Sequence, residues 1–413
     1  MTKLNRSTLI LELLFFLPFS VYLFSIFLSR HESSGFSKYT LLIIIVFALI
    51  FQVVILFTNV SLSDDIYRFY YEGKGLVNGI NPYVTPVQEF PDNLKDQYFE
   101  EVNNPYVTSP YPPLAIFIFA VLYLISPTPI IYRICFSLSF LVSVLGCYKI
   151  IDPETKWKLI IYAWNPLLHI ETANGSHFDV IVALMIIIML LCLKAERLAT
   201  AGFFLVLGFL LKYYPILLVF AFWKQYEKRG LVIIFIGVLS YVLLVLVNPF
   251  LIQGLIIYLE DWYFNASIFW LVYALLNYFL LSKIIVGITI LIILTIIAFK
   301  SQIDYISSYR SAVIIIGSLL LLQPVFHPWY IFWLFPFLII DNKMNLSWIF
   351  LSGTLVLSYH VYILYDTIGI WIESNLIRMT EYLPFFSVLI FENWVFDRIK
   401  HKKVSELSNK MKL

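Results

Sequence analysis

The stretch LLIIIVFALIFQVVILFTN, residues 41–59, is an almost continuous apolar run, and it decides the fold class. At a rise of about 1.5 Å per residue, a helix of this length spans about 28 Å, close to the roughly 30 Å of a membrane's hydrocarbon core. Comparable runs occur at Leu9–Leu28 and Val180–Lys194. Of the 413 residues, 61% are hydrophobic and 13% are charged, whereas soluble domains carry about 25% charged residues. The sequence therefore predicts an all-α polytopic membrane protein.

Short segments rich in Lys, Asp and Asn divide the apolar sequence into about 11–13 predicted transmembrane helices. The segment Pro113–Ser126 is apolar but short, and prolines bracket it, so we expect it to lie on the membrane surface. We expect a single integral membrane domain over residues 1–396, followed by a basic cytoplasmic tail over residues 397–413. The predicted spans are 8–28, 40–59, 130–150, 158–173, 178–194, 231–250, 283–299, 311–326, 329–340, 346–365 and 381–396, with two short helices near 200–222.

The distribution of charge predicts the side on which each loop lies. If the loop 60–128 is outside and the sides alternate from there, the inside segments hold 19 of the 28 Lys and Arg residues. This bias is the one expected of a positive-inside topology, and it places the C-terminal tail in the cytoplasm. Lys3 and Arg6 are too few to orient the N-terminus. The net charge of +2 gives no indication of a nucleic-acid partner, and the three cysteines lack the spacing of a metal site or a disulfide framework.

The sharpest polar motif is Ser63-Asp64-Asp65, where an apolar run meets the outer loop. Adjacent carboxylates repel each other, which raises one pKa and favours the sharing of a proton or the binding of a cation. One interpretation is an ordinary helix start, with Ser63 as N-cap, the acids in the first turn and Arg68 over them. The other is catalytic, because a carboxylate at the membrane surface can deprotonate a hydroxyl brought against a lipid-borne electrophile.

Two further motifs place ionisable residues at the ends of spans. The turn Asn174–Asp179 contains His177 and Asp179, either as site residues or as part of a solvated loop with a helix cap. Lys212 interrupts an apolar stretch just before Tyr214-Pro215, where we expect the helix to break and turn back. Its ammonium is expected either to meet an anionic phosphate or to reach water by snorkelling.

A last motif is His327, which lies between two prolines and beside Trp329 and Tyr330. Such a histidine can bind a phosphate or a sugar, and it can equally belong to an aromatic belt at the membrane edge. Four other ionisable residues carry no assignment from the sequence: Glu12, Glu171, Glu392 and His360.

In chain order these motifs resemble those of bacterial polyprenyl-phosphate-sugar mannosyltransferases, which belong to the GT-C glycosyltransferase superfamily. The resemblance runs from about residue 60 to about residue 340 and implies a GT-C fold, with the active site between the first large extracytoplasmic loop and the cytoplasmic (inner) membrane. The chain has Tyr71-Glu72-Gly73 where the family often has Trp-Asp-Gly, which keeps the carboxylate. The other matching blocks are Ser63-Asp64-Asp65-x-Tyr67-Arg68, Gly79-x-Asn81-Pro82-Tyr83, Tyr111-Pro112-Pro113-Leu114, Asn174-Gly175-Ser176-His177-Phe178-Asp179, Lys212-x-Tyr214-Pro215 and His327-Pro328-Trp329-Tyr330.

The resemblance implies an inverting transfer of a sugar, usually mannose, from a polyprenyl-phosphate donor to a glycan or glycolipid acceptor, beside membrane lipid. Metal-independent catalysis without a cofactor is expected, with a divalent metal left open. By position, Asp64 or Asp65 is the catalytic base, and the choice between them stays open. The remaining assignments are donor phosphate or sugar binding by Arg68, Lys212, His327 and Tyr330, and a second polar loop at His177 and Asp179.

Two other functions fit parts of the pattern. A transporter or lipid-linked-sugar flippase would use the same acids and Lys212 to bind a charged substrate, but it predicts polar residues spread through the spans, whereas here they gather on one face. A polysaccharide polymerase or ligase resembles the pattern less, because such enzymes usually use Arg and His in a large late loop. The late loop at 366–381 contains only Arg378 and no histidine.

Overall fold

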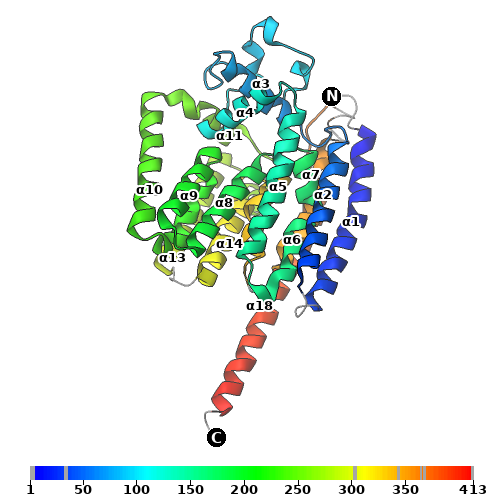
Figure 1. The fold of residues 1–413 in the computed structure, drawn as a ribbon, viewed down its shortest axis with the longest axis vertical. Helices are drawn as coiled ribbons and strands as arrows, with labels where there is room; N and C mark the ends of the chain where they lie inside the picture. Colours follow the sequence, from blue (N-terminus) through cyan, green and yellow to red (C-terminus); the bar gives the residue numbers. More distant parts are fainter. Residues whose placement is uncertain are drawn as a thin grey trace.

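The computed structural model describes residues 5–31, 36–300, 305–341, 345–362, 365 and 369–410. Over these residues the chain is mostly helical, and their only β-type pairing is an isolated bridge between Phe264 and Val325. The helices form an upright bundle with a cap of loops and short helices at one end (Figure 1). The all-α polytopic fold is thereby confirmed.

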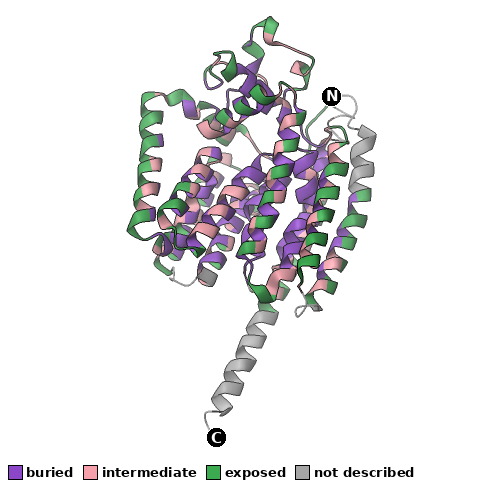
Figure 2. Cartoon of the chain, viewed as in Figure 1, coloured by how far each residue is buried: buried purple, intermediate pink, exposed green. Residues whose placement is uncertain are grey.

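Apolar side chains cover the outside of the bundle. Figure 2 shows exposed residues on the outward faces of α2 (Lys38–Leu56) and α10 (Val219–Val247), and buried residues between the helices. Only 17% of the most apolar window of α2 is buried, although its mean hydropathy is 2.9. Because no protein core covers these side chains, they are suited to lipid. Within the described residues, four helical segments are long and apolar enough to cross a membrane: α2, α5 (Ile130–Ile150), Tyr214–Val247 and α13 (Phe279–Lys300).

The interior of the bundle is built around α5. This helix packs against α2, α7 (Pro166–Ala173) and α8 (Asp179–Lys194), and α9 (Leu198–Leu211) packs in turn against α8 and α10. α1 (Asn5–His31) contacts α7 and the turn η8 (Leu355–Tyr359). The packing brings the ends of α7, α8 and α9 together below the cap, where the polar motifs lie.

Two predicted spans are interrupted in the structure. The span 158–173 consists of α6 (Leu159–Ala163) and α7, because Pro166 lacks a backbone N–H and the Asn165 side chain caps α7. The Asn165 oxygen accepts hydrogen bonds from the backbone N–H groups of residues 167 and 168, at 3.0 and 3.3 Å. The span 329–340 is replaced by η7 (Pro328–Trp333) and α15 (Phe335–Leu338), which are buried inside the bundle.

The segment after α9 also differs from its prediction. α9 ends at Leu211, as the Tyr214-Pro215 pair predicts, and η5 (Tyr214–Leu218) follows. α9 is the first of the two predicted short helices, whereas the second continues from η5 into the predicted span 231–250, because α10 runs from Val219 to Val247 across a kink at Glu227, whose φ is 49°. Two helices not predicted from the sequence come next, namely α11 (Gln253–Asp261) and α12 (Ile268–Leu276).

The loop 60–128 forms the cap. α3 (Asp65–Val77) packs against α4 (Pro113–Ile125), which confirms the short helix predicted at Pro113–Ser126. Gly73 allows this close packing, because a Cβ there would meet the carbonyl oxygen of Phe119 and lie 2.9 Å from the Tyr132 hydroxyl. The remaining elements are η1 (Val87–Glu89), η2 (Asp92–Leu94), η3 (Phe99–Glu101), η4 (Pro153–Lys158), η6 (Pro249–Ile252), α14 (Tyr305–Leu322), α16 (Leu346–Thr354) and α18 (Asn375–Lys410).

α18 contains both the predicted span 381–396 and most of the predicted tail. It continues as a helix to Lys410, and its C-terminal part points away from the cap (Figure 1). The cap and the C-terminal end of the chain therefore lie at opposite ends of the bundle. Residues 411–413 lie outside the described residues.

Candidate active site

Asp64 and Asp65 lie at the start of α3, where the apolar α2 gives way to the cap. Asp64 occupies the N-cap position, but its side chain makes no capping hydrogen bond, and the Ser63 hydroxyl accepts the backbone N–H of Asp65 at 3.3 Å. The side-chain amide of Asn103 donates to both carboxylates, at 2.7 Å to Asp64 and 2.6 Å to Asp65. An ordinary helix start accounts for neither bond. The two acids are bound to the loop that crosses above them.

The surroundings raise the pKa of both acids. Burial, followed by the charge of Asp65, raises the pKa of Asp64 to about 6, and the Asn103 hydrogen bond opposes this rise. Burial also raises the pKa of Asp65, while the Asn103 bond and the charges of Arg68 and Lys212 lower it. A carboxylate with a pKa near 6 is mostly ionised at neutral pH and is basic enough to accept a proton. The pair has the chemistry of a general base.

Arg68 fixes the loop that carries Asn103. Its Nε donates to Glu72 at 3.0 Å, one turn further along α3, and not to the two aspartates that the sequence places beneath it. Its side chain is 6% exposed, and its Nε and both Nη atoms donate to acceptors of the cap. These contacts position the cap. The sequence-based assignment of Arg68 to donor binding stays a prediction. The Nη atoms donate to the backbone carbonyls of Asn103, Asn104, Val107 and Thr108, at 2.7–3.3 Å.

His177 lies in the turn between α7 and α8, with its ring between two carboxylates. Its Nδ1 is 3.6 Å from Asp65 Oδ2, and its Nε2 is 3.3 Å from Glu171 Oε2. The Tyr359 hydroxyl donates to the other Glu171 oxygen at 2.8 Å. Gly175 leaves room for this arrangement, because a Cβ there would lie 2.9 Å from Glu171 Oε2. The row Asp65–His177–Glu171 can hold a proton or pass one along after small shifts of the ring.

Lys212 binds the third carboxylate of the site. Its Nζ donates to both oxygens of Asp179, at 2.7 and 2.8 Å, and the Trp333 indole N–H donates to Asp179 at 2.5 Å. The ammonium lies 4.6 Å from the centre of the Tyr330 ring, and the rings of Phe178 and Trp333 are within 5.3 Å of it. Asp179 is fully buried, whereas 16% of the Lys212 side chain is exposed. The cation is therefore held by protein yet remains open on one side.

Stacked aromatic rings connect the second polar loop with the late motif. The Trp329 ring lies 3.5 Å from the His177 ring and 4.2 Å from the His327 ring, and both pairs are nearly parallel. Burial, followed by the charge of Lys212, lowers the pKa of both histidines, so their rings are neutral at pH 7. Tyr330 exchanges a hydrogen bond with Tyr258 at 2.8 Å. Neutral imidazoles on a stack can donate hydrogen bonds without adding charge.

The structure gathers most of the residues selected from the sequence and adds others. One region of the structure contains Asp65, His177, Asp179 and Lys212. The positive charge of Lys212 lowers the pKa of Asp65 there. Glu171 carried a signal, because it is an acid within an apolar stretch, but nothing in the sequence paired it with His177. The residues missed by the sequence are Asn103, Glu171, Trp333 and Tyr359, which contribute through contacts between distant segments.

No group of three or more His, Cys, Asp or Glu side chains that could hold a metal ion occurs in the part of the chain that the structure describes. Metal-independent catalysis stays a prediction.

A model of the N-terminal domain of alpha-(1->6)-mannopyranosyltransferases matches residues 10–226, which is more than half of the 413 residues. The matched part contains the aspartate pair, His177, Asp179 and Lys212, and it ends before His327. No curated protein and no solved structure matches the chain.

Proposed function

Because this chain belongs to the alpha-(1->6)-mannopyranosyltransferase family, we propose that it transfers a mannosyl unit from a polyprenyl-phosphate carrier to a glycan or glycolipid acceptor. Its family and its apolar helices make it a membrane glycosyltransferase. The carrier, the inverting stereochemistry and the extracytoplasmic face are parts of the proposal. The observation that carries it is the aspartate pair held by Asn103 next to His177 and Lys212. A base and a cation near one reaction centre are what transfer from a phosphate requires.

Asp65 is the base in this proposal. Its Oδ1 is held by Asn103, while its Oδ2 faces His177 at 3.6 Å, a gap longer than a hydrogen bond. An acceptor hydroxyl placed beside Oδ2 can give its proton to Asp65 as its oxygen attacks the anomeric carbon and the bond from that carbon to the phosphate oxygen breaks. Asp64 shares the Asn103 amide, and the charge of Asp65 adds to burial in raising the pKa of Asp64. Because the two neighbouring carboxylates repel each other, we expect them to share the proton once it is transferred.

Lys212 receives the leaving phosphate in this proposal. Its ammonium is already oriented by Asp179 and Trp333, so little reorganisation is needed when negative charge develops near it. The neutral rings of His177 and His327 can donate further hydrogen bonds to the phosphate. Phosphate is an acceptable leaving group without full protonation, so a cation and hydrogen-bond donors suffice. Arg68 contributes by positioning the loop of Asn103, since its donors are all engaged.

The transporter alternative requires a polar path through the spans. The buried polar residues deeper in the bundle are bound to one another, as in the pair of Gln52 and His169 at 2.8 Å. The second ring nitrogen of His169 is 2.8 Å from the carbonyl of Ala163. A histidine with both ring nitrogens engaged is poorly suited to bind a passing substrate, which favours the transferase.

The test is a reaction with defined donors. Purified protein is incubated with α-(1→6)-mannobiose and with β- or α-linked polyprenyl-phosphate mannose, with the glucose analogue in parallel. An inverting enzyme that makes an α linkage consumes only the β-linked mannose donor. Asp65→Asn should lower the rate by about 10²–10⁴-fold, whereas Asp92→Asn, an exposed acid of the same loop, should leave it unchanged.

The proposal is wrong if no polyprenyl-phosphate sugar is consumed, or if Asp65→Asn retains the wild-type rate. In sealed vesicles, passage of the lipid-linked sugar without a new glycosidic bond would support the transporter instead.

A further inference from the structure

Glu171 is a buried carboxyl close to the aspartate pair, and the proposed function gives it no role. It lies in α7 and is fully buried. The Tyr359 hydroxyl donates to its Oε1 at 2.8 Å, and its Oε2 lies 3.3 Å from Nε2 of His177. Within the described residues, this Oε2 and this Nε2 make no hydrogen bond of good geometry. Two buried polar atoms therefore face each other across a gap that a hydrogen bond can close.

The turn after α7 holds these two groups together. The backbone N–H of His177 donates to the carbonyl of Glu171 at 2.9 Å, and Ser176 has a left-handed φ of 60°. Gly175 keeps the gap free, because a Cβ there would lie 2.9 Å from Glu171 Oε2 and 3.0 Å from His177 Nε2. The Trp329 ring is nearly parallel to the imidazole, with 3.5 Å between the ring centres, and fixes its plane. The local structure therefore favours a direct contact between the carboxyl and the ring.

This contact requires one proton, and the proton has two possible positions. If it lies on Nε2 of His177, Glu171 is a carboxylate, and the lone pair of Nδ1 faces Asp65 Oδ2 at 3.6 Å. If it lies on Glu171, the carboxyl O–H donates to Nε2, and the proton of the neutral ring lies on Nδ1, facing Asp65. The partner of one ring nitrogen therefore determines what the other nitrogen presents to Asp65.

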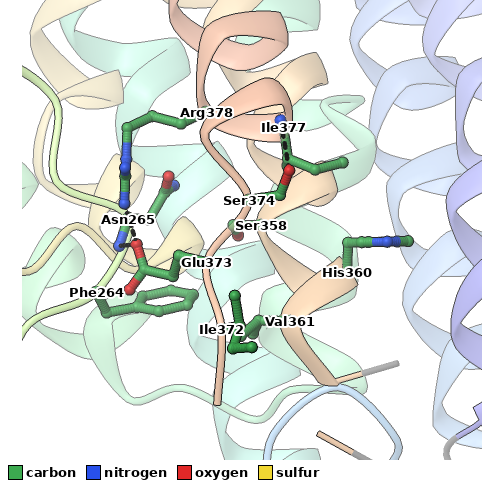
Figure 3. A pocket seen from close by; sticks show the side chains of 10 residues that line it. All are labelled: Phe264, Asn265, Ser358, His360, Val361, Ile372, Glu373, Ser374, Ile377 and Arg378. Atoms are coloured by element: carbon green, nitrogen blue, oxygen red, sulfur yellow. Dashed lines mark hydrogen bonds and ion pairs between the residues drawn. The ribbon is translucent and has the colours of Figure 1, made fainter. Parts of the chain in front are cut away.

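The charges in the bundle favour the proton on Glu171. Three other largely buried carboxyls are paired with cations, namely Asp179 with Lys212, Glu72 with Arg68 and Glu373 with Arg378. Figure 3 shows the last of these pairs, which lines a small pocket at the start of α18. Among the described residues, Glu171 has no such cation, and its charged neighbours include Asp65 and Asp179. An unpaired carboxylate costs more to bury than the neutral acid does, so burial favours the protonated form of Glu171.

Asp65 is the better place for a negative charge. Burial raises its pKa, whereas the Asn103 hydrogen bond and the charges of Arg68 and Lys212 lower it. A lone pair on His177 Nδ1 would repel this charge, and an N–H would stabilise it. The contacts on the two sides of the ring therefore favour the same tautomer.

From this arrangement we propose that Glu171 is a positioning residue, whose protonated carboxyl donates to His177 Nε2 and keeps the ring proton on Nδ1, beside Asp65. Tyr359 orients the carboxyl by binding its other oxygen. The Nδ1–H is the hydrogen-bond donor that the proposed function expects of His177, so the effect of Glu171 on the rate rests on that function. The position of the proton does not.

The test is the tautomer of His177, measured at pH 7 on the full chain in detergent without substrate. In protein labelled with ¹⁵N-histidine, NMR distinguishes protonated from unprotonated ring nitrogens, and His177→Gln identifies the signals of this ring. The wild type should carry the proton on Nδ1. Glu171→Gln should keep it there, because the amide donates to Nε2 while its carbonyl accepts the Tyr359 hydroxyl. Glu171→Met removes the donor, so the proton should populate both nitrogens, since only the longer contact with Asp65 is left.

Turnover provides the second measurement. Glu171→Met should lower kcat by about 10- to 100-fold, the loss of one hydrogen bond from the ring N–H to a charged group, and leave the KM of both substrates unchanged. Glu171→Gln should restore most of this loss. Glu381→Met is the matched control, because Glu381 in α18 is also a fully buried carboxyl, and it should change neither the tautomer nor kcat.

The inference is overturned if the wild-type ring carries its proton on Nε2, or if Glu171→Met leaves the tautomer unchanged. It is also overturned if Glu171→Gln loses as much activity as Glu171→Met, which is the result expected of an ionised Glu171. The expected tautomers in a protein that consumes no donor would support the position of the proton and contradict the proposed function alone.

Discussion

Asn103→Ala tests the central electrostatic feature of the site, since one amide serves both aspartates. The substitution removes hydrogen bonds of 2.7 and 2.6 Å to Asp64 and Asp65. It leaves the backbone carbonyl of residue 103 in place, so Arg68 keeps that acceptor and three others in the same loop. The change therefore acts on the carboxylates with little effect on the position of the loop.

The magnitude follows from the bonds that are lost. A hydrogen bond to a charged group contributes about 1.5–3 kcal/mol, and one pKa unit corresponds to about 1.4 kcal/mol. The loss of the amide therefore raises the pKa of both carboxyls further, by about one unit at the lower end of that range, because the Asn103 bond opposes the rise that burial gives each of them. A base must be deprotonated to act, so activity rises with pH through this pKa. The acidic limb of the rate profile should shift to higher pH by about one unit.

The assay is kcat/KM for mannosyl transfer between pH 5 and pH 9. At pH 6 the Asn103→Ala enzyme should be several-fold slower than the wild type, and the difference should shrink as the pH rises above the shifted limb. Asn93→Ala, an exposed asparagine in the same cap, is the matched control and should keep the wild-type profile. An unshifted limb, or an equal loss at every pH, would refute the role of the amide in setting the proton affinity.

Two other predictions test the cation and the cap. Lys212→Met should lower kcat/KM by about 10²–10³-fold, because the negative charge that develops on the phosphate loses its cation. Lys95→Met on the cap surface is the control and should have no effect. Initial rates at saturating acceptor measure both. Gly73→Ala should destabilise the protein by about 1–3 kcal/mol, because the new methyl group meets the Phe119 carbonyl. Gly287→Ala in α13, where a methyl group meets nothing within 4 Å, should not lower the unfolding temperature, and equal thermal stability of these two glycine variants would contradict the packing argument.

The sequence was sufficient to predict the bounds of helices whose ends are marked by prolines or by the end of an apolar run. α5 has the bounds predicted for it, because Pro129 precedes it and the apolar run stops at Ile150. α4 was predicted within one residue for the same reason, with prolines at its start and end. The break at Asn165-Pro166 could have been read from the sequence, since Asn is a strong N-cap and Pro suits the first helical position. The residues on either side of this break are apolar, so the two helices resemble one continuous span in the sequence.

The contacts that give the site its chemistry could not be predicted in this way. Asn103 lies 38 residues from Asp65, and Tyr359 lies 188 residues from Glu171, so their pairing depends on how the cap and the bundle pack. The partner of Arg68 could not be predicted either, although the candidates lie in the same helix. Arg68 has acids on both sides in sequence, and its Nε binds Glu72 while its Nη atoms bind carbonyls of the loop.

The different fates of Arg68 and Lys212 show what makes a cation available for catalysis. Both are ion-paired and largely buried, and a single sequence cannot separate them. Arg68 meets one carboxylate and four carbonyls, so a phosphate would have to displace several hydrogen bonds to reach it. Among the described residues, Lys212 meets Asp179 and aromatic faces, and the exposed part of its side chain can approach an oxygen without breaking that ion pair. Spare donor capacity, and not charge alone, is therefore the reason why we propose Lys212 as the residue that receives the leaving phosphate.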